Sequence, residues 1–278
     1  MVGLVSMAMS IGLFLVGRQA QQEHREIFLQ PTGEVGPDPF TSPLAGTGSA
    51  RTVAGTDPAT PTAPSTSGEV AVASRYGSEP GLYGGVRKTA ACDPRRLMDF
   101  LRQNPGPGQA WAGVLGMATA DLPRYVAWLT PVVLTGDIRV TDHRYRDGRG
   151  VPFQAVLQGG TAVLLDWHGV PRVRCQGGNP LLAPVVVDKP VYTGQRWPGF
   201  EPGRTVVVVP SRQPLRGLVL TDVTTGDRFA RPVGGTGPTD RDVAIPSGTS
   251  RSGWTPTVTP PPALRTSPQA AARTAQAR

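Results

Sequence analysis

The sequence predicts an α+β domain in which a small layer of three short helices packs on a mostly antiparallel β-sheet or small barrel. Two observations support this class: apolar residues recur at helical spacing between residues 93 and 130, and the period changes to two from residue 137 onward. The apolar residues also concentrate between about residues 80 and 233, which indicates one core-forming unit of roughly 150 residues. The full prediction adds an N-terminal transmembrane helix and a disordered linker and tail.

The helical layer begins at Asp93-Pro94, where Asp93 is a typical N-cap and proline suits the first helical position. Leu97, Phe100 and Leu101 follow at helical spacing and mark the inner face. The stretch Pro105–Gly108 (PGPG) is expected to end this helix. Two more helical runs are expected over residues 110–118 and 119–129, the second ending before Pro131.

The β part begins where Ile138 and Val140 alternate with Asp137, Arg139 and Thr141. Apolar runs separated by Gly-rich or polar turns then predict further strands. These strands are expected over Val151–Leu157, Thr161–Asp166, Val170–Cys175, Val185–Val187, Thr205–Val209 and Leu215–Val223. Thr225-Gly226-Asp227 is expected to turn the last of them into the segment RFARPV.

The chain divides into five expected segments. They are a transmembrane anchor (1–17), a juxtamembrane segment with a candidate docking strand (18–40), a disordered linker (41–75), an extracytoplasmic α+β domain (76–233) and a disordered tail rich in Pro, Ala and Thr (234–278). Ser, Thr, Pro, Gly and Ala dominate the linker, which contains no aromatic residue and is therefore expected to be flexible. A flexible chain of about 32 residues spans on the order of 30 Å.

Residues 1–17 carry no charged side chain, and 17 residues is the short limit for a membrane-spanning helix. No basic residue precedes the run and Arg18-Gln19-Ala20 is a poor cleavage site, so an uncleaved anchor is favoured over a cleaved signal peptide. An N-terminal core helix is the alternative, but the run lacks a polar face. The only nearby arginines follow the run, so the charge rule leaves the topology open.

The net charge of +8 does not indicate nucleic-acid binding. Arginine supplies 26 of the 28 basic residues, as only Lys88 and Lys189 are lysines. A nucleic-acid interface would gather the basic residues on one face among aromatic side chains. Here the arginines are scattered and only 6% of residues are aromatic.

Cys92 and Cys175, the two cysteines of the chain, form a candidate disulfide. The bond would close a loop of about 84 residues and could contribute on the order of 4 kcal/mol by restricting the unfolded chain. A disulfide is the expected state outside the cytoplasm. The alternative makes Cys175 a nucleophile with His168 as its base. The run HGVPRVRC is similar to pieces of cysteine-based cell-wall transpeptidases, but their Ser-x-Gly-Cys run is missing and no third group is recognisable.

No metal site and no cofactor are expected. Asp142, His143 and Asp147 could form only a weak oxygen and nitrogen site, and the chain has no His-x-x-x-His or Cys-x-x-Cys spacing. The Gly-rich stretches lack the Lys-Ser/Thr of a phosphate loop and are interpreted as turns.

The stretch from Pro131 to Leu181 resembles an uncharacterised domain family of actinobacterial membrane-anchored envelope proteins. The likeness extends to EIFLQPTGEVGPDPF, GSEPGLYGG, Cys92 to Trp111 and VLTDVTTGDRFARPV, and so covers most of residues 26–233. It implies a membrane anchor, a linker and one domain outside the cytoplasm. Relatives often carry a further cysteine shortly after the position of Cys175, where this chain has Gln176-Gly177, and this leaves the pairing of Cys92 open. The resemblance implies no activity and no catalytic residue.

Two functions remain. The first is a membrane-tethered, non-enzymatic binding, sensing or structural module that meets an envelope polymer or a partner membrane protein. The second is an envelope enzyme acting on peptidoglycan or polysaccharide, using Cys175 or an unrecognised carboxylate. For a binding module, exposed aromatic and arginine side chains on the turn side of the β unit are the candidate surface. They are Arg144, Tyr145, Arg146, Trp167, His168 and Arg172, and decoration of turns explains them equally well.

Overall fold

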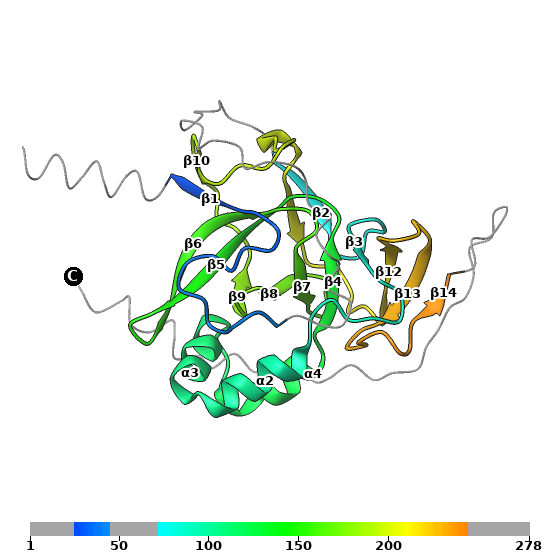
Figure 1. The fold of residues 1–278 in the computed structure, drawn as a ribbon, viewed down its shortest axis with the longest axis horizontal. Helices are drawn as coiled ribbons and strands as arrows, with labels where there is room; N and C mark the ends of the chain where they lie inside the picture. The colour runs from blue at the N-terminus through cyan, green and yellow to red at the C-terminus, as the bar shows by residue number, and fades with distance from the viewer. Residues whose placement is uncertain (1–24, 45–71, 244–278) are drawn as a thin grey trace, which may run out of the picture.

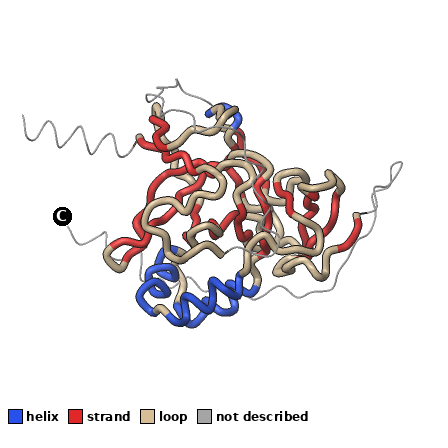
Figure 2. The backbone as a smooth tube through the Cα atoms, viewed as in Figure 1, coloured by secondary structure: helices blue, strands red, loops and turns tan. Residues whose placement is uncertain are grey.

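The computed structural model describes residues 25–44 and 72–243 (Figure 1). Most of them belong to one large mixed sheet of 14 strands, with three short α-helices along one side (Figure 2). The helices are α2 (Pro94–Gln103), α3 (Pro105–Val114) and α4 (Leu122–Ala127), and the 3₁₀ turns are η1 (Thr119–Asp121) and η2 (Pro202–Arg204).

The first seven strands are β1 (Glu26–Gln30), β2 (Ala73–Tyr76), β3 (Tyr83–Gly85), β4 (Thr130–Leu134), β5 (Ile138–Arg146), β6 (Arg149–Leu157) and β7 (Ala162–Leu165). The others are β8 (Pro171–Arg174), β9 (Asn179–Leu182), β10 (Val191–Gly194), β11 (Val206–Val209), β12 (Gly217–Asp222), β13 (Arg228–Pro232) and β14 (Arg241–Asp242). Their order is β10-β1-β6-β5-β9-β8-β7-β4-β3-β12-β13-β14, and β11 branches from β5 and carries β2.

The predicted fold class was wrong in the proportion of helix to strand and in the size and strand directions of the sheet. Helices are a minor component of the described residues, and the sheet is neither small nor simply antiparallel. Strand β1 pairs in parallel with both β6 and β10, β11 pairs in parallel with β2 and β5, and β12 pairs in parallel with β3. Parallel partners lie far apart in the chain, so local periodicity does not reveal them.

No transmembrane helix is found: within residues 25–44 and 72–243 no helix is long and apolar enough to span a bilayer. The anchor expected over residues 1–17 lies outside the described residues, as do residues 45–71 of the expected linker and residues 244–278 of the expected tail. Strand β14 falls at the start of that expected tail.

Two local predictions were also wrong. Residues 185–187 are not a strand but part of a loop between β9 and β10. Helix α2 ends just before the stretch PGPG, as predicted, but the next helix begins at Pro105 itself and not near residue 110. Proline fits the first turn of a helix because its missing N–H would have no partner there. Asp93 is the N-cap of α2 as predicted, and its carboxylate accepts a hydrogen bond from the Arg95 N–H at 2.9 Å.

Three apolar clusters form because successive side chains along a strand face opposite sides. On β6, Ala155 and Leu157 join the core enclosed by the curved sheet, whereas Val156 faces the other side. The helical layer packs in the second cluster around Trp111, against Leu164 and Val173 of the sheet. The third and smallest cluster comprises Ile27, Leu29, Val156, Tyr192 and Phe200, with Val187 and Trp197 against it.

Residues 26–44 are part of this fold. Ile27 and Leu29 of β1 are fully buried, and β1 lies between β6 and β10. The following segment crosses toward the helices, where the Leu44 N–H donates to the Cys175 carbonyl at 2.9 Å and the Asp93 N–H donates to the Leu44 carbonyl at 3.0 Å. The folded part of the chain therefore begins about fifty residues before the domain boundary expected at residue 76.

Candidate functional site

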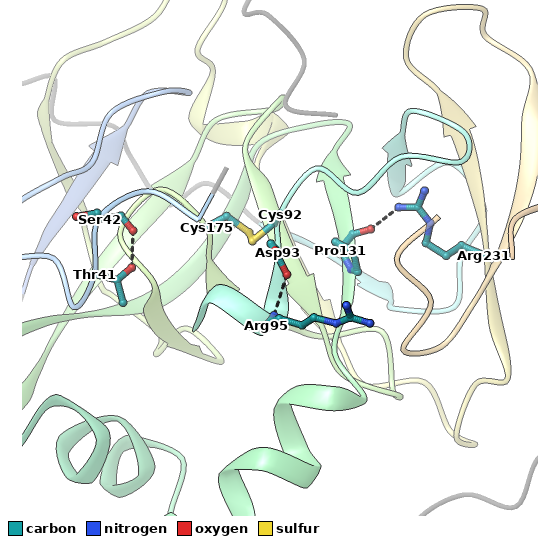
Figure 3. Close-up of a disulfide and its surroundings, with 8 residues drawn as sticks. All are labelled: Thr41, Ser42, Cys92, Asp93, Arg95, Pro131, Cys175 and Arg231. Atoms are coloured by element: carbon teal, nitrogen blue, oxygen red, sulfur yellow. Dashed lines mark hydrogen bonds between the residues drawn. A yellow bond between two sulfur atoms is a disulfide. The ribbon is translucent and has the colours of Figure 1, made fainter. Parts of the chain in front are cut away.

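Cys92 and Cys175 form a disulfide with Cα atoms 6.0 Å apart (Figure 3). Cys92 directly precedes the N-cap of α2, and Cys175 directly follows β8, so the bond ties the helical layer to the sheet. Both residues are buried. In this state Cys175 carries no thiol, and a thiolate is the form of cysteine that attacks a substrate.

Arg144, Tyr145 and Arg146 lie at the end of β5, and their side chains have partners within the chain. The Arg144 guanidinium stacks over the Phe153 ring at 5.0 Å. Tyr145 packs on Phe40 with ring centroids 5.2 Å apart. Arg146 forms an ion pair with Asp38 at 2.6 Å. The contacts of Tyr145 and Arg146 hold the segment that follows β1 onto the β5–β6 hairpin.

Trp167, His168 and Arg172 lie around the β7–β8 turn, and they too have partners. Trp167 packs edge-on against Tyr125 at 5.8 Å. His168 Nδ1 lies 2.9 Å from the Ser211 carbonyl oxygen, and Arg172 forms an ion pair with Asp166 at 2.7 Å. Among the described residues, this group and Arg144–Arg146 contact different partners. Each of the six side chains therefore has at least one contact within the fold.

The weak metal candidates are also engaged elsewhere. Asp142 is fully buried in an ion pair with Arg174 at 2.9 Å. His143 Nδ1 lies 3.0 Å from the Pro180 carbonyl oxygen, and burial lowers the pKa of His143. Asp147 is in the exposed β5–β6 turn with φ of 50°. The residues that the structure describes contain no group of three or more metal-ligating side chains.

The strongest candidate site is a pocket of about 400 Å³ that the sequence did not indicate. The floor of the pocket is formed by three residues that lie side by side on three parallel strands. Val207 of β11 pairs with Ser74 of β2 on one side and with Arg139 of β5 on the other. Adjacent strands in register present such residues on the same face. Because Ile138 and Val140 face the main core, Arg139 faces the pocket.

Arg139 is 7% exposed and has no carboxylate partner among the described residues. Its Nε makes no hydrogen bond, and one Nη donates a long 3.4 Å bond to the Val185 carbonyl. Burial lowers the pKa of Arg139, with an opposing effect from Tyr192. A buried charge is costly unless it is paired and hydrogen-bonded, so this guanidinium is an incomplete site for an anion.

The wall of the pocket is the loop between β9 and β10, residues 183–190. It carries Val185 and Val186, which are 59% and 99% exposed. Lys189 adopts φ of 47°, and its carbonyl accepts two hydrogen bonds from the Arg25 guanidinium at 3.0 and 2.7 Å. The loop is thus fixed at the end of β1 where the described part of the chain begins.

Cations outnumber acids in the pocket lining, which contains Arg139 and Lys189 against Asp188. Burial raises the pKa of the Tyr192 hydroxyl, and Arg139 and Arg196 act in the opposite direction because a nearby cation favours the phenolate. Asp188 is the one acid in the pocket lining, and it is exposed, as is Lys189 beside it. The lining contains no histidine or cysteine. Its residues can hold an anion against an apolar wall, since Val72, Val185, Val186, Val187 and Val207 also line it.

A second pocket of about 310 Å³ lies by β12, β13 and β14. Its charged groups are paired with one another: Arg87 contacts Asp242 at 2.6 Å, and Asp222 accepts hydrogen bonds from the Arg87 and Thr224 N–H groups. Arg87 also has a buried Nε without a hydrogen-bond partner, but unlike Arg139 its guanidinium is paired with a carboxylate, so this pocket is the weaker candidate.

The sequence contained part of the signal for the Arg139 pocket. Arg139 interrupts an alternating apolar pattern, and VVVDKP places three valines before a charged turn. Periodicity could identify the two segments, but it could not show that β11 and β2 bring them together. The valines were instead interpreted as a strand.

Comparison with known families gives one match. Residues 73–234, more than half of the chain, match the model of a domain of unknown function, DUF6777. No curated protein and no solved structure matches the chain. The match covers β2 to β13 and leaves β1 outside it.

Proposed function

This chain belongs to the family of the domain of unknown function DUF6777, and from that premise we propose that it is a membrane-attached, extracytoplasmic binding module of the cell envelope. Its site is the pocket around Arg139, and its ligand is an anionic envelope component. The single observation that carries the proposal is a buried guanidinium that faces a pocket without a carboxylate partner among the described residues.

Three features support a place outside the cytoplasm. The Cys92–Cys175 disulfide is typical of an oxidising compartment. Residues 1–17 are uncharged and apolar, and we propose that they attach the protein to the membrane. The chain also resembles actinobacterial envelope proteins with a membrane anchor, and we propose that it belongs to that group.

The proposal uses Arg139 and not Cys175. Cys175 is bonded to Cys92 and is 3% exposed, so the envelope enzyme that the sequence suggested as an alternative would lack its candidate nucleophile here. Arg139, in contrast, lines the pocket and has a buried Nε without a hydrogen-bond partner. A planar guanidinium binds carboxylate or phosphate groups through two parallel hydrogen bonds.

Inorganic phosphate is a suitable probe of this site. The melting temperature of the full chain in neutral detergent micelles would be measured while phosphate replaces chloride at constant ionic strength. An anion at about 100 times its Kd adds about 2.7 kcal/mol, or roughly 5–10 °C for a domain of 150–250 residues. Arg139→Gln is expected to remove this increase, and to leave the anion-free protein at least as stable because an unpaired buried charge is lost.

The matched control is Arg144→Gln. Arg144 also has a buried Nε without a hydrogen-bond partner, but it stacks on Phe153 and does not line the pocket. This variant should keep the full response to phosphate. The same response in the parent protein and in Arg139→Gln would refute the proposed site.

A further inference from the structure

We infer that the anion is the headgroup of an acidic phospholipid, and that residues 183–190 form a loop that contacts the lipid surface. This inference rests on the proposed function and names the ligand class of the same pocket. It combines three features of the described residues: an exposed pair of valines, the place where the chain enters the fold, and the unpaired cation behind the valines.

Two valines of this loop expose apolar side chains to water, which is energetically unfavourable. Four large hydrophobic residues are exposed among the described residues, and two of them, Val185 and Val186, are adjacent at the tip of this loop. Their neighbour Val187 turns inward and packs against the third cluster. Exposed apolar side chains grouped beside a pocket indicate a surface that another apolar phase covers.

The loop is fixed at the side where the N-terminal segment joins the fold. The Arg25 guanidinium donates to the Lys189 carbonyl, and the Val191 N–H donates to the Arg25 carbonyl at 2.9 Å. Figure 1 shows β1 and β10 side by side at one end of the sheet. Only residues 18–25 separate this point from the apolar run 1–17, and a fully extended chain of eight residues spans at most about 28 Å. A membrane that holds residues 1–17 would therefore lie close to the loop.

The charges suit an anionic surface. Arg25 and Lys189 lie at the outer end of the loop, and Arg139 lies behind the valines, where its Nε has no partner. Acidic lipids attract basic residues that lie near the bilayer surface. A phospholipid offers a phosphate for the buried guanidinium and acyl chains for the valines. A soluble anion would use only the guanidinium.

The test places a tryptophan at the loop tip. Full-length Val186→Trp would be reconstituted into vesicles of brominated phosphatidylcholine, with or without an equal part of phosphatidylglycerol, and the fluorescence quenching beyond that of the parent protein would be recorded. Bromine quenches tryptophan only on close contact. The matched control is Val223→Trp, since Val223 is also exposed but lies after β12, far along the sheet from β10.

The expected result is additional quenching for Val186→Trp and none for Val223→Trp, with a further increase when phosphatidylglycerol is present. Combining Arg139→Gln with Val186→Trp should remove the phosphatidylglycerol-dependent part, because the headgroup loses its buried partner. Equal quenching at both valine positions would overturn the membrane contact. Quenching that ignores phosphatidylglycerol, or that persists unchanged with Arg139→Gln, would overturn the headgroup assignment.

Failure of this inference is distinguishable from failure of the proposed function. If phosphate stabilises the protein through Arg139 but the introduced tryptophan is not quenched, the pocket binds a soluble anion and the lipid inference is wrong. If phosphate has no effect that depends on Arg139, the proposed site itself is wrong.

Discussion

Three buried arginines show what distinguishes a structural cation from a candidate binding group. Arg174 pairs with Asp142 and donates to the Glu34 and Val35 carbonyls at 2.9 and 2.6 Å. Arg231 pairs with Asp240 at 2.7 Å and donates to three backbone carbonyls. Arg139 has one long hydrogen bond and no carboxylate among the described residues. All three arginines are buried, but they differ in their ion-pair and hydrogen-bond partners.

Arg174→Met is expected to destabilise the fold strongly. It leaves Asp142 buried without its cation and removes two hydrogen bonds from the segment after β1. Breaking a buried ion pair by removing one partner costs about 3–5 kcal/mol. Urea unfolding of the oxidised protein, followed by circular dichroism, measures the change.

The control for that change is Arg102→Met. Arg102 forms an exposed ion pair with Asp99 within α2, at 2.8 Å. Exposed pairs contribute about 0–1 kcal/mol. Similar losses in the two variants would contradict the structural role assigned to Arg174.

Among the elements, strand β1 does most to define where the folded part of the chain begins. The sequence places residues 26–30 in a juxtamembrane segment with a candidate docking strand, and β1 lies inside the sheet between β6 and β10. Residues 45–71 therefore connect two parts of one fold, since both Leu44 and Val72 are on the domain. The family match begins only at residue 73, so the matched region lacks a strand that the fold uses.

A fragment of residues 72–243 is expected not to fold cooperatively. It lacks Ile27, Leu29, Phe40 and Leu44, which are all buried. Burying each such side chain contributes about 1.5–3 kcal/mol, so their joint loss, about 6–12 kcal/mol, matches the whole stability of a typical domain. Denaturant titration of this fragment beside residues 25–243 measures the difference.

Adding a peptide of residues 25–44 to the shorter fragment provides the control. The peptide supplies β1 and the residues that follow it, and should restore a cooperative transition. A fragment that unfolds cooperatively without the peptide would show that β1 is an accessory strand.

Local patterns predicted the elements better than their arrangement. Alternation along residues 138–140 and the Asp93-Pro94 signal correspond to β5 and to the start of α2, because both depend on near neighbours in sequence. The pairing of β1 with β10 joins residues more than 160 positions apart, and nothing local specifies it. The Arg139 pocket was missed for the same reason, since its floor needs β2, β5 and β11 together.

At the scale of the whole molecule, the disulfide, the strand order and the pocket together indicate one orientation relative to the membrane. The disulfide closes the helical layer on the sheet, and β1 and β10 form the opposite end of the strand order from β14. The chain enters at β1, beside the exposed valines and the Arg139 pocket. Attachment through residues 1–17 would direct that end toward the membrane. The disulfide and the proposed envelope role both require the folded part to lie outside the cytoplasm.

The most direct measurement is labelling of intact cells that express the full chain, with a membrane-impermeant maleimide and intact mass as the readout. Labelling would be compared with and without prior reduction, and allowed to run long enough for local opening to expose the two buried thiols. The account predicts two labels after reduction and none before it, because Cys92 and Cys175 are bonded to each other and lie outside the cytoplasm. Labels that appear only after lysis would place the domain in the cytoplasm and contradict the account.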